Sequence, residues 1–165
     1  MPLKNAKVHA ITRKTNGIAR KIISPVEVKN IITGKSIQTN GLWDTGATGS
    51  VITKSTASAL GLVPSGIRKV RGVHGIRDVR EYFVNITLSN KNITVNASVT
   101  ECDELTADNS TGMLIGMNII ALGDFAISNF RNNTMMSFRV PSLQEIDFIA
   151  GMKAGQQVIK TKIPG

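Results

Sequence analysis

A single carboxylate lies between two apolar runs in the stretch 42–52, which reads Leu-Trp-Asp-Thr-Gly-Ala-Thr-Gly-Ser-Val-Ile. A charge in such surroundings costs free energy unless it is paired or hydrogen-bonded, so Asp44 is the first candidate for catalysis. Thr45 adds a hydroxyl that can bond across a close contact, and Gly46 lets the backbone turn tightly or lets a ligand approach. The pattern predicts a buried strand that delivers a carboxylate into a tight turn.

A second motif lies at 113–118, where the apolar run Met-Leu-Ile meets Gly116 and Asn118 follows. A glycine at the end of a buried strand indicates that two backbone segments cross there too closely for a Cβ atom. The residues after it predict a short helix that ends at Gly123. The motif therefore predicts a strand–helix junction with a close backbone crossing.

The segment 67–88 has the pattern of a long hairpin. Two arms of alternating apolar and polar residues flank the sequence Gly72-Val73-His74-Gly75. Glycines at the tip of two alternating arms are typical of an exposed hairpin that can move against the rest of a domain. This hairpin lies between the Asp44 motif and the Gly116 motif in the chain.

Taken in order, the three motifs resemble those of aspartic peptidases, and Ala47 makes the first one similar to the retropepsin branch. That branch comprises the retroviral proteases and their cellular and bacterial relatives. The resemblance covers residues 37–140. It implies that Asp44 is catalytic, that Thr45 and Gly46 support the active-site turn, and that the hairpin is a flap closing over bound peptide. The substrate-binding residues that it implies are Gly46, Ala47, Thr48, Val73, His74, Gly75, Ile115 and Gly116.

The resemblance also implies a homodimer. Hydrolysis of a peptide bond by this chemistry uses two carboxylates that share one water and one proton. The chain contains one Asp-Thr-Gly, and no other acidic residue has a comparable apolar lead-in and glycine turn. The second carboxylate is therefore expected from Asp44 of another copy across a twofold axis. Five cations on the flap arms suggest acidic residues in the peptide or protein substrate: Arg68, Lys69, Arg71, Arg77 and Arg80.

Two other functions stay open at this stage. The chain could be a retropepsin-fold module that dimerises or binds peptide without cleaving it, although an intact Asp-Thr-Gly-Ala argues against that. It could also be a basic β domain that binds nucleic acid, because its formal charge is +9. We do not expect a nucleic-acid partner, since no arginine-rich helix or basic stripe with interleaved aromatic residues is apparent.

The composition gives no indication of a metal site, a cofactor or a membrane anchor. Cys102 is the only cysteine, and His9 and His74 are the only histidines, so no cluster with metal-ligand spacing occurs. The basic N-terminus has no apolar signal core, and no run approaches the ~18 apolar residues of a membrane helix. The sequence therefore predicts a cytoplasmic protein.

The predicted fold is mainly β, a closed barrel-like retropepsin fold with short helices and a flap hairpin. We expect one domain over 1–165, divided into N-terminal strands (1–36), a catalytic core (37–140) and a C-terminal helix and tail (141–165). Asn16-Gly17 predicts a hairpin after the first strand. Thr53 is the expected N-cap of a helix over 54–60, and a capping box at 142–145 predicts a helix through about residue 153. A last strand is expected over 158–163.

Overall fold

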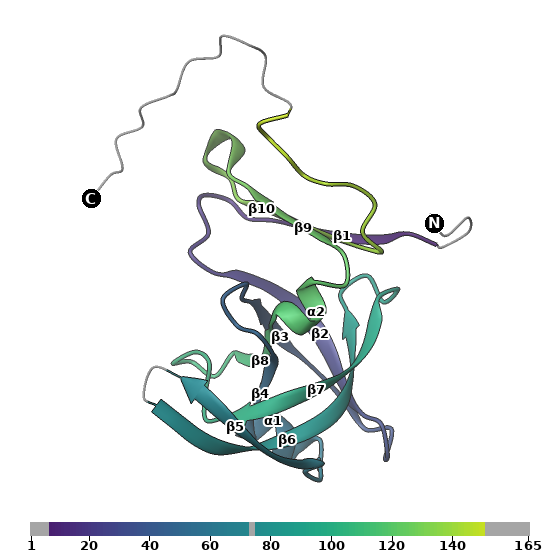
Figure 1. Cartoon of the computed structure of the whole chain (residues 1–165), viewed down its shortest axis with the longest axis vertical. Helices are drawn as coiled ribbons and strands as arrows, with labels where there is room; N and C mark the ends of the chain where they lie inside the picture. Colours follow the sequence, from purple (N-terminus) through teal and green to yellow (C-terminus); the bar gives the residue numbers. More distant parts are fainter. Residues whose placement is uncertain (1–6, 73–74, 151–165) are drawn as a thin grey trace.

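The computed structural model describes residues 7–72 and 75–150 (Figure 1). Most of its elements are strands, with a few short helices between them, and the flap arms are the strands on either side of residues 73–74. The elements are β1 (His9–Lys14), β2 (Ile22–Asn30), β3 (Ser36–Trp43), β4 (Ser50–Thr53), α1 (Lys54–Ala59), β5 (Gly66–Gly72), β6 (Gly75–Leu88), β7 (Thr94–Cys102), β8 (Thr111–Ile115), α2 (Met117–Ile120), β9 (Asp124–Ser128), the 3-10 turn η1 (Phe130–Asn132) and β10 (Met135–Val140).

Six strands form a closed barrel in the order β2-β3-β8-β4-β7-β6, and β2 pairs with β6 to complete the ring. The flap strand β5 extends this sheet by pairing with β6 alone. Closure gives the barrel strands partners on both sides over much of their length, so few backbone groups are left at an open edge. The predicted mainly β class and closed barrel are confirmed.

The barrel core follows from the alternation of apolar residues along its strands. From Ser24 on β2 and from Tyr82 on β6 every second residue is buried, including Val26, Val28 and Val84, each at most 1% exposed. β8 is buried at all five positions because it lies between β3 and β4 and contacts both α1 and α2. The strand that leads to Gly116 is therefore a fixed part of the core.

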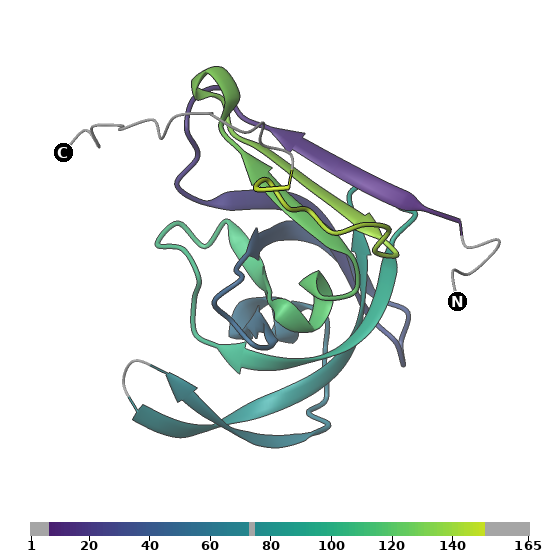
Figure 2. The same cartoon turned by 45° about the horizontal axis from the view of Figure 1, so that its top comes forward.

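A second sheet of three strands, in the order β1-β10-β9, lies beside the barrel (Figures 1 and 2). An aromatic cluster joins the two sheets. The Trp43 ring at the end of β3 stacks on Phe125 of β9 at 5.4 Å between centroids and lies 5.1 Å from Phe138 of β10. The Trp43 indole N–H donates to the Ser24 hydroxyl at 2.8 Å, so the residue preceding Asp44 is held from both sides.

The hairpin predicted at Asn16-Gly17 is wrong. Gly17 does adopt positive φ (86°), but β1 pairs with β10 and not with β2. The register joins His9 to Val140 and Lys14 to Met135. The chain turns at Gly17 toward the residues between β9 and β10, so the first two strands belong to different sheets.

The helix predicted from the capping box at 142–145 is also wrong within the described residues, because 142–150 are irregular, with a bend at 144 and a turn at 148–150. The Ser142 hydroxyl donates to Asp124 instead of capping a helix. Ile146 and Ile149, which would share one apolar face of such a helix, are 44% and 80% exposed. A short helix depends on packing of its apolar face, and here that face has no surface to cover.

The other predicted elements are confirmed where the structure describes them. Thr53 caps α1, because its Oγ1 accepts the N–H of Thr56 at 3.3 Å, and Gly61 follows the helix with φ of 62°. The strand before Gly116 and the short helix after it lie where the second motif placed them. The end of the predicted C-terminal helix (151–153) and the strand over 158–163 lie outside the described residues.

Candidate active site

Asp44 directly follows β3 and begins a turn that returns to the core at Ser50. Its N–H donates to the carbonyl of Ile115 at 3.0 Å, which ties the start of the turn to the end of β8. Its Oδ1 accepts a hydrogen bond from the N–H of Gly46 at 2.8 Å, and this bond orients the carboxylate within the turn. Oδ2 has no hydrogen-bond partner among the described residues. The half-buried carboxylate is thus held in place with one oxygen free for another group.

Gly116 lies where the turn crosses the second motif. The N–H of Met117 donates to the carbonyl of Ala47 at 2.8 Å, and that of Asn118 donates to Thr48 at 3.1 Å. A Cβ atom on Gly116 would lie 2.4 Å from the Gly49 carbonyl oxygen and 2.9 Å from that of Ala47. Backbone cannot yield as a flexible side chain can, so only glycine fits this crossing. The structure therefore brings the first and second motifs together.

Ser50 is a part of the site that the sequence analysis missed. It is 1% exposed, accepts the N–H of Gly116 at 3.0 Å, and donates to Asn118 Oδ1 at 2.7 Å. The Asn118 amide in turn reaches the carbonyl of Ser98 at 3.5 Å. Ser50 thus connects the end of the turn, the glycine crossing and the first turn of α2. A hydroxyl directly before the apolar pair 51–52 was the available signal, because a polar group there must find a partner.

The flap arms are β5 and β6, which pair from Gly66↔Glu81 to Gly72↔Gly75. Val73 and His74 lie outside the described residues, and Gly75 begins β6 with φ of 99°. Three of the five arm cations are held by carboxylates within the chain. The ion pairs are Arg68–Glu81, Lys69–Asp78 and, at 3.9 Å, Arg80–Glu101.

Comparison with known proteins decides the family. The family model described as aspartyl protease matches residues 25–119, which is more than half of the chain and includes the Asp44 turn and Gly116. The chain belongs to this aspartyl protease family. A search of curated protein sequences gave no match.

A search of solved structures found chains of retropepsin-like proteases that are similar to this one. A retropepsin-like aspartic protease from Rickettsia conorii is 13% identical with a TM-score of 0.51, and the match covers 84% of this chain and 99% of that one. The retroviral protease-like domain of Ddi1 from Leishmania major is 15% identical (TM-score 0.46; 79% and 99% covered). The foamy viral protease-reverse transcriptase is 22% identical (TM-score 0.44), and the match covers 61% of this chain but 12% of that one. The Rickettsia structure confirms the retropepsin-like fold.

The residues that the sequence analysis expected to bind substrate differ in exposure. Thr45, Gly46 and Thr48 are exposed, and Ala47 is half-buried. The Ile115 side chain is fully buried, so Ile115 presents only its backbone to the turn. The exposed face of the turn is therefore made of small residues, which suits close contact with another backbone.

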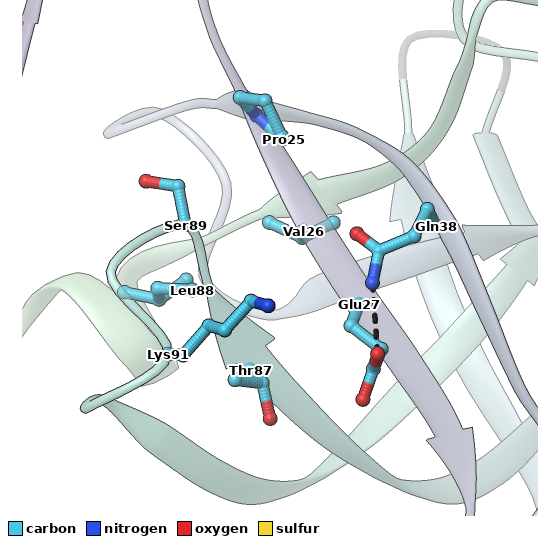
Figure 3. Close-up of a pocket in the computed structure, with 8 residues that line it drawn as sticks. All are labelled: Pro25, Val26, Glu27, Gln38, Thr87, Leu88, Ser89 and Lys91. Atoms are coloured by element: carbon cyan, nitrogen blue, oxygen red, sulfur yellow. Dashed lines mark hydrogen bonds between the residues drawn. The ribbon is translucent and has the colours of Figure 1, made fainter.

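A cavity of about 340 Å³ lies away from this turn, between β2 and the end of β6 (Figure 3). Buried Val26 and Leu88 contribute its apolar lining, and Gln38, which donates to Glu27 at 2.8 Å, lies on one side. None of its lining residues comes from the active-site turn.

Pro25, at the rim of this cavity, lies where β2 is paired with β3 but not yet with β6. A proline at such an open edge blocks pairing with another strand.

Within the described residues we looked for a metal-binding cluster and an activated thiol. These residues contain no group of three or more His, Cys, Asp or Glu residues that could hold a metal ion. Burial raises the pKa of the Cys102 thiol to about 11, so this thiol is protonated near neutral pH and a poor nucleophile.

Over 7–72 and 75–150, no helix has the length and apolar character needed to span a bilayer.

Proposed function

We propose that this aspartyl protease is an endopeptidase that acts as a twofold homodimer, with one Asp44 from each copy in a shared site. One carboxylate takes a proton from water, and the resulting hydroxide attacks the scissile carbonyl carbon. The other carboxylate donates its proton to the carbonyl oxygen. As the tetrahedral intermediate collapses and the C–N bond breaks, the first carboxyl gives the proton it took from water to the nitrogen, which leaves as an amine. The second carboxylate takes a proton back from a hydroxyl of the intermediate, which restores the starting state. Two neighbouring carboxylates hold one proton between them, as this cycle requires.

The shortage of free carboxylates within one chain supports the shared site. Most of the other acidic residues within the described ranges are already engaged elsewhere. These pairs are Glu27 with Gln38, Asp78 with Lys69, Glu81 with Arg68, Glu101 with Tyr82, Asp103 with Lys54, Asp108 with Ser110 and Asp124 with Arg139. None bonds to Asp44. A second copy is the simplest source of the carboxylate that the chemistry needs.

The exposed turn supports the same proposal. Within 7–72 and 75–150 no group bonds to Asp44 Oδ2, and the Asp44 N–H is anchored to the Ile115 carbonyl. In the dimer the exposed Thr45 hydroxyl would bond across the twofold axis and brace the two turns against each other. Substrate would then extend over Gly46, Ala47 and Thr48, with Val73, His74 and Gly75 closing over it. The observation that carries the proposal is the rigid Asp44 turn, built on the Gly116 crossing and open on its outer face.

The test compares wild type with Asp44→Asn on a diverse peptide library, with the oligomeric state measured in the same samples. We expect Asp44→Asn to lower kcat/KM by roughly 10²–10⁴-fold or more, because it removes the general acid–base pair. Asp147→Asn makes the same chemical change at an exposed position outside the site and should keep full activity.

A mixing experiment tests the sharing of the site directly. Excess Asp44→Asn chain, exchanged with wild type, should reduce the activity per wild-type chain, because mixed dimers hold only one native carboxylate. Unchanged activity per wild-type chain would refute the shared site. A wild type that dimerises and binds peptides but cleaves none would instead establish the non-catalytic module.

A further inference from the structure

Two segments far apart in the sequence meet at one end of the three-stranded sheet, beyond the ends of β1 and β9. Residues 15–21 follow β1, and residues 129–134 join β9 to β10 (Figures 1 and 2). The N–H of Gly17 donates to Asn133 Oδ1 at 3.0 Å, and the N–H of Thr134 donates to the Gly17 carbonyl at 3.1 Å. The N–H of Ala19 donates to the Thr134 hydroxyl at 2.8 Å. These bonds make the two segments one surface.

Five exposed cations lie in these segments or directly before them in the sequence, and neither segment contains an acidic residue. No Asp or Glu occurs in 1–26 or in 125–144. None of the five cations forms an ion pair with the described residues, whereas three of the five cations on the flap arms do. With Phe130 they form what we call the basic patch: Arg13, Lys14, Arg20, Lys21 and Arg131.

Phe130 gives the basic patch an aromatic surface. Its side chain is 74% exposed, although burial of a phenyl ring normally stabilises a fold. The Arg131 guanidinium lies over the ring at 5.0 Å from its centroid. Arg131 and Asn132 both have positive φ, 52° and 58°, a conformation that costs free energy in residues other than glycine. The chain thus holds a strained turn that presents a ring and a cation to solvent.

We propose that the basic patch binds single-stranded nucleic acid, a function separate from proteolysis. The cations would contact phosphates, and a base would stack on the free face of Phe130. Aromatic rings beside a basic surface are how proteins bind single strands without reading their sequence. The stacked Phe130–Arg131 pair favours this ligand over an acidic protein, which needs charge but no flat ring. The hydrogen bonds of Thr15, Gly17 and Ala19 to residues 133 and 134 place both segments within reach of one strand.

The sequence alone could not reveal this surface. The cations at 13–21 and the aromatic residue at 130 belong to segments that no local pattern connects. They meet because β1 pairs with β10, which places Lys14 opposite Met135 and Thr15 beside Thr134. The sequence of each segment taken separately is typical of an ordinary charged surface loop.

The test is fluorescence anisotropy of a labelled oligothymidylate of about 16 nucleotides titrated with the full chain over a salt series. Arg20→Gln/Lys21→Gln should weaken binding and make the slope of log K against log salt less steep by about 1.4, since each phosphate contact on a single strand contributes about 0.7. Phe130→Ala should weaken binding about fivefold or more and leave the slope unchanged. Lys35→Gln/Lys91→Gln removes the same charge from two exposed turns outside the basic patch and should bind like wild type.

Three results would overturn the proposal. The first is no binding near physiological salt, and the second is equal weakening by the two double variants, which would indicate non-specific charge attraction. The third is that polyglutamate, or vesicles rich in phosphatidylserine, bind as tightly as the oligonucleotide, and that Phe130→Ala does not weaken this binding. Circular dichroism of each variant ensures that these comparisons are made between folded proteins.

Discussion

At the scale of single residues, the site depends on contacts between backbone groups. Asp44 is oriented by the N–H of Gly46 and by the carbonyl of Ile115, and the turn is held by two further N–H groups of α2. Side chains near it, such as Ser50 and Asn118, stabilise that backbone arrangement. Backbone geometry positions a catalytic group well because it is less variable than side-chain rotamers.

Gly116→Ala tests this dependence. The added Cβ would meet the Gly49 and Ala47 carbonyl oxygens at 2.4 and 2.9 Å, so the turn must move away from β8. We expect a loss of about 1–3 kcal/mol in the free energy of unfolding, as for other overpacked sites. We also expect reduced kcat/KM, because Asp44 moves with the turn. Denaturant titration and peptide cleavage measure the two effects.

Gly49→Ala is the matched control, because it changes the other glycine of the same crossing. A Cβ on Gly49 meets no atom within 4 Å, and its φ lies outside the strained range. Its free energy of unfolding should stay within about 0.5 kcal/mol of wild type. Equal destabilisation by both substitutions would show that the crossing is not the cause.

At the scale of elements, the end of the three-stranded sheet is fixed by one carboxylate. The Ser142 hydroxyl, the N–H of Leu143 and the Arg139 guanidinium all bond to Asp124, at the start of β9. The segment after β10 is therefore held by a side-chain network and not by the predicted helix. Asp124 also follows Gly123, where a Cβ atom would clash with the Arg139 carbonyl. The start of β9 is therefore in close contact with the end of β10.

This network predicts a pH dependence of stability. The hydrogen bonds from Ser142 and Leu143, with the Arg139 guanidinium, lower the pKa of Asp124 from 3.8 to about 2. A carboxyl whose pKa is lower in the folded state stabilises the fold above its unfolded pKa, and this contribution is lost as the pH falls from about 4 to about 2. Wild type should therefore exceed Asp124→Asn in thermal midpoint at pH 6, and the gap should close toward pH 2. A gap that is constant over this range would contradict the assignment.

At the scale of the whole molecule, the sequence predicted what is encoded locally. The Asp44 turn, the flap arms, the Thr53 cap and the strand before Gly116 each depend on residues close together in the chain. The pairing of β1 with β10 depends on residues at opposite ends of it, and nothing in the Asn16-Gly17 pattern distinguishes a hairpin from a turn toward another sheet. The helix predicted from the 142–145 capping box failed for the same reason, since the local signal was present but the packing surface was absent.

The two sheets are expected to unfold as one unit, as a single domain requires. Trp43 is the only tryptophan, and its ring lies between the barrel strand that leads to Asp44 and the aromatic residues of β9 and β10. Its fluorescence therefore reports whether the three-stranded sheet is docked, whereas far-UV circular dichroism reports all strands. At one fixed protein concentration, both signals should follow the same urea transition.

Phe138→Ala tests the link between the sheets, because Phe138 is 1% exposed and contacts Trp43. We expect the free energy of unfolding to fall by about 3–5 kcal/mol, with the two signals still coincident. Phe130→Ala makes the same change at an exposed ring and should change the free energy of unfolding by no more than about 0.5 kcal/mol. A fluorescence transition that precedes the loss of circular dichroism, in wild type or in Phe138→Ala, would mean that the three-stranded sheet detaches alone. The stability of the Asp44 turn would then depend on the barrel alone, and the contacts of Trp43 with β9 and β10 would not couple the unfolding of the two sheets.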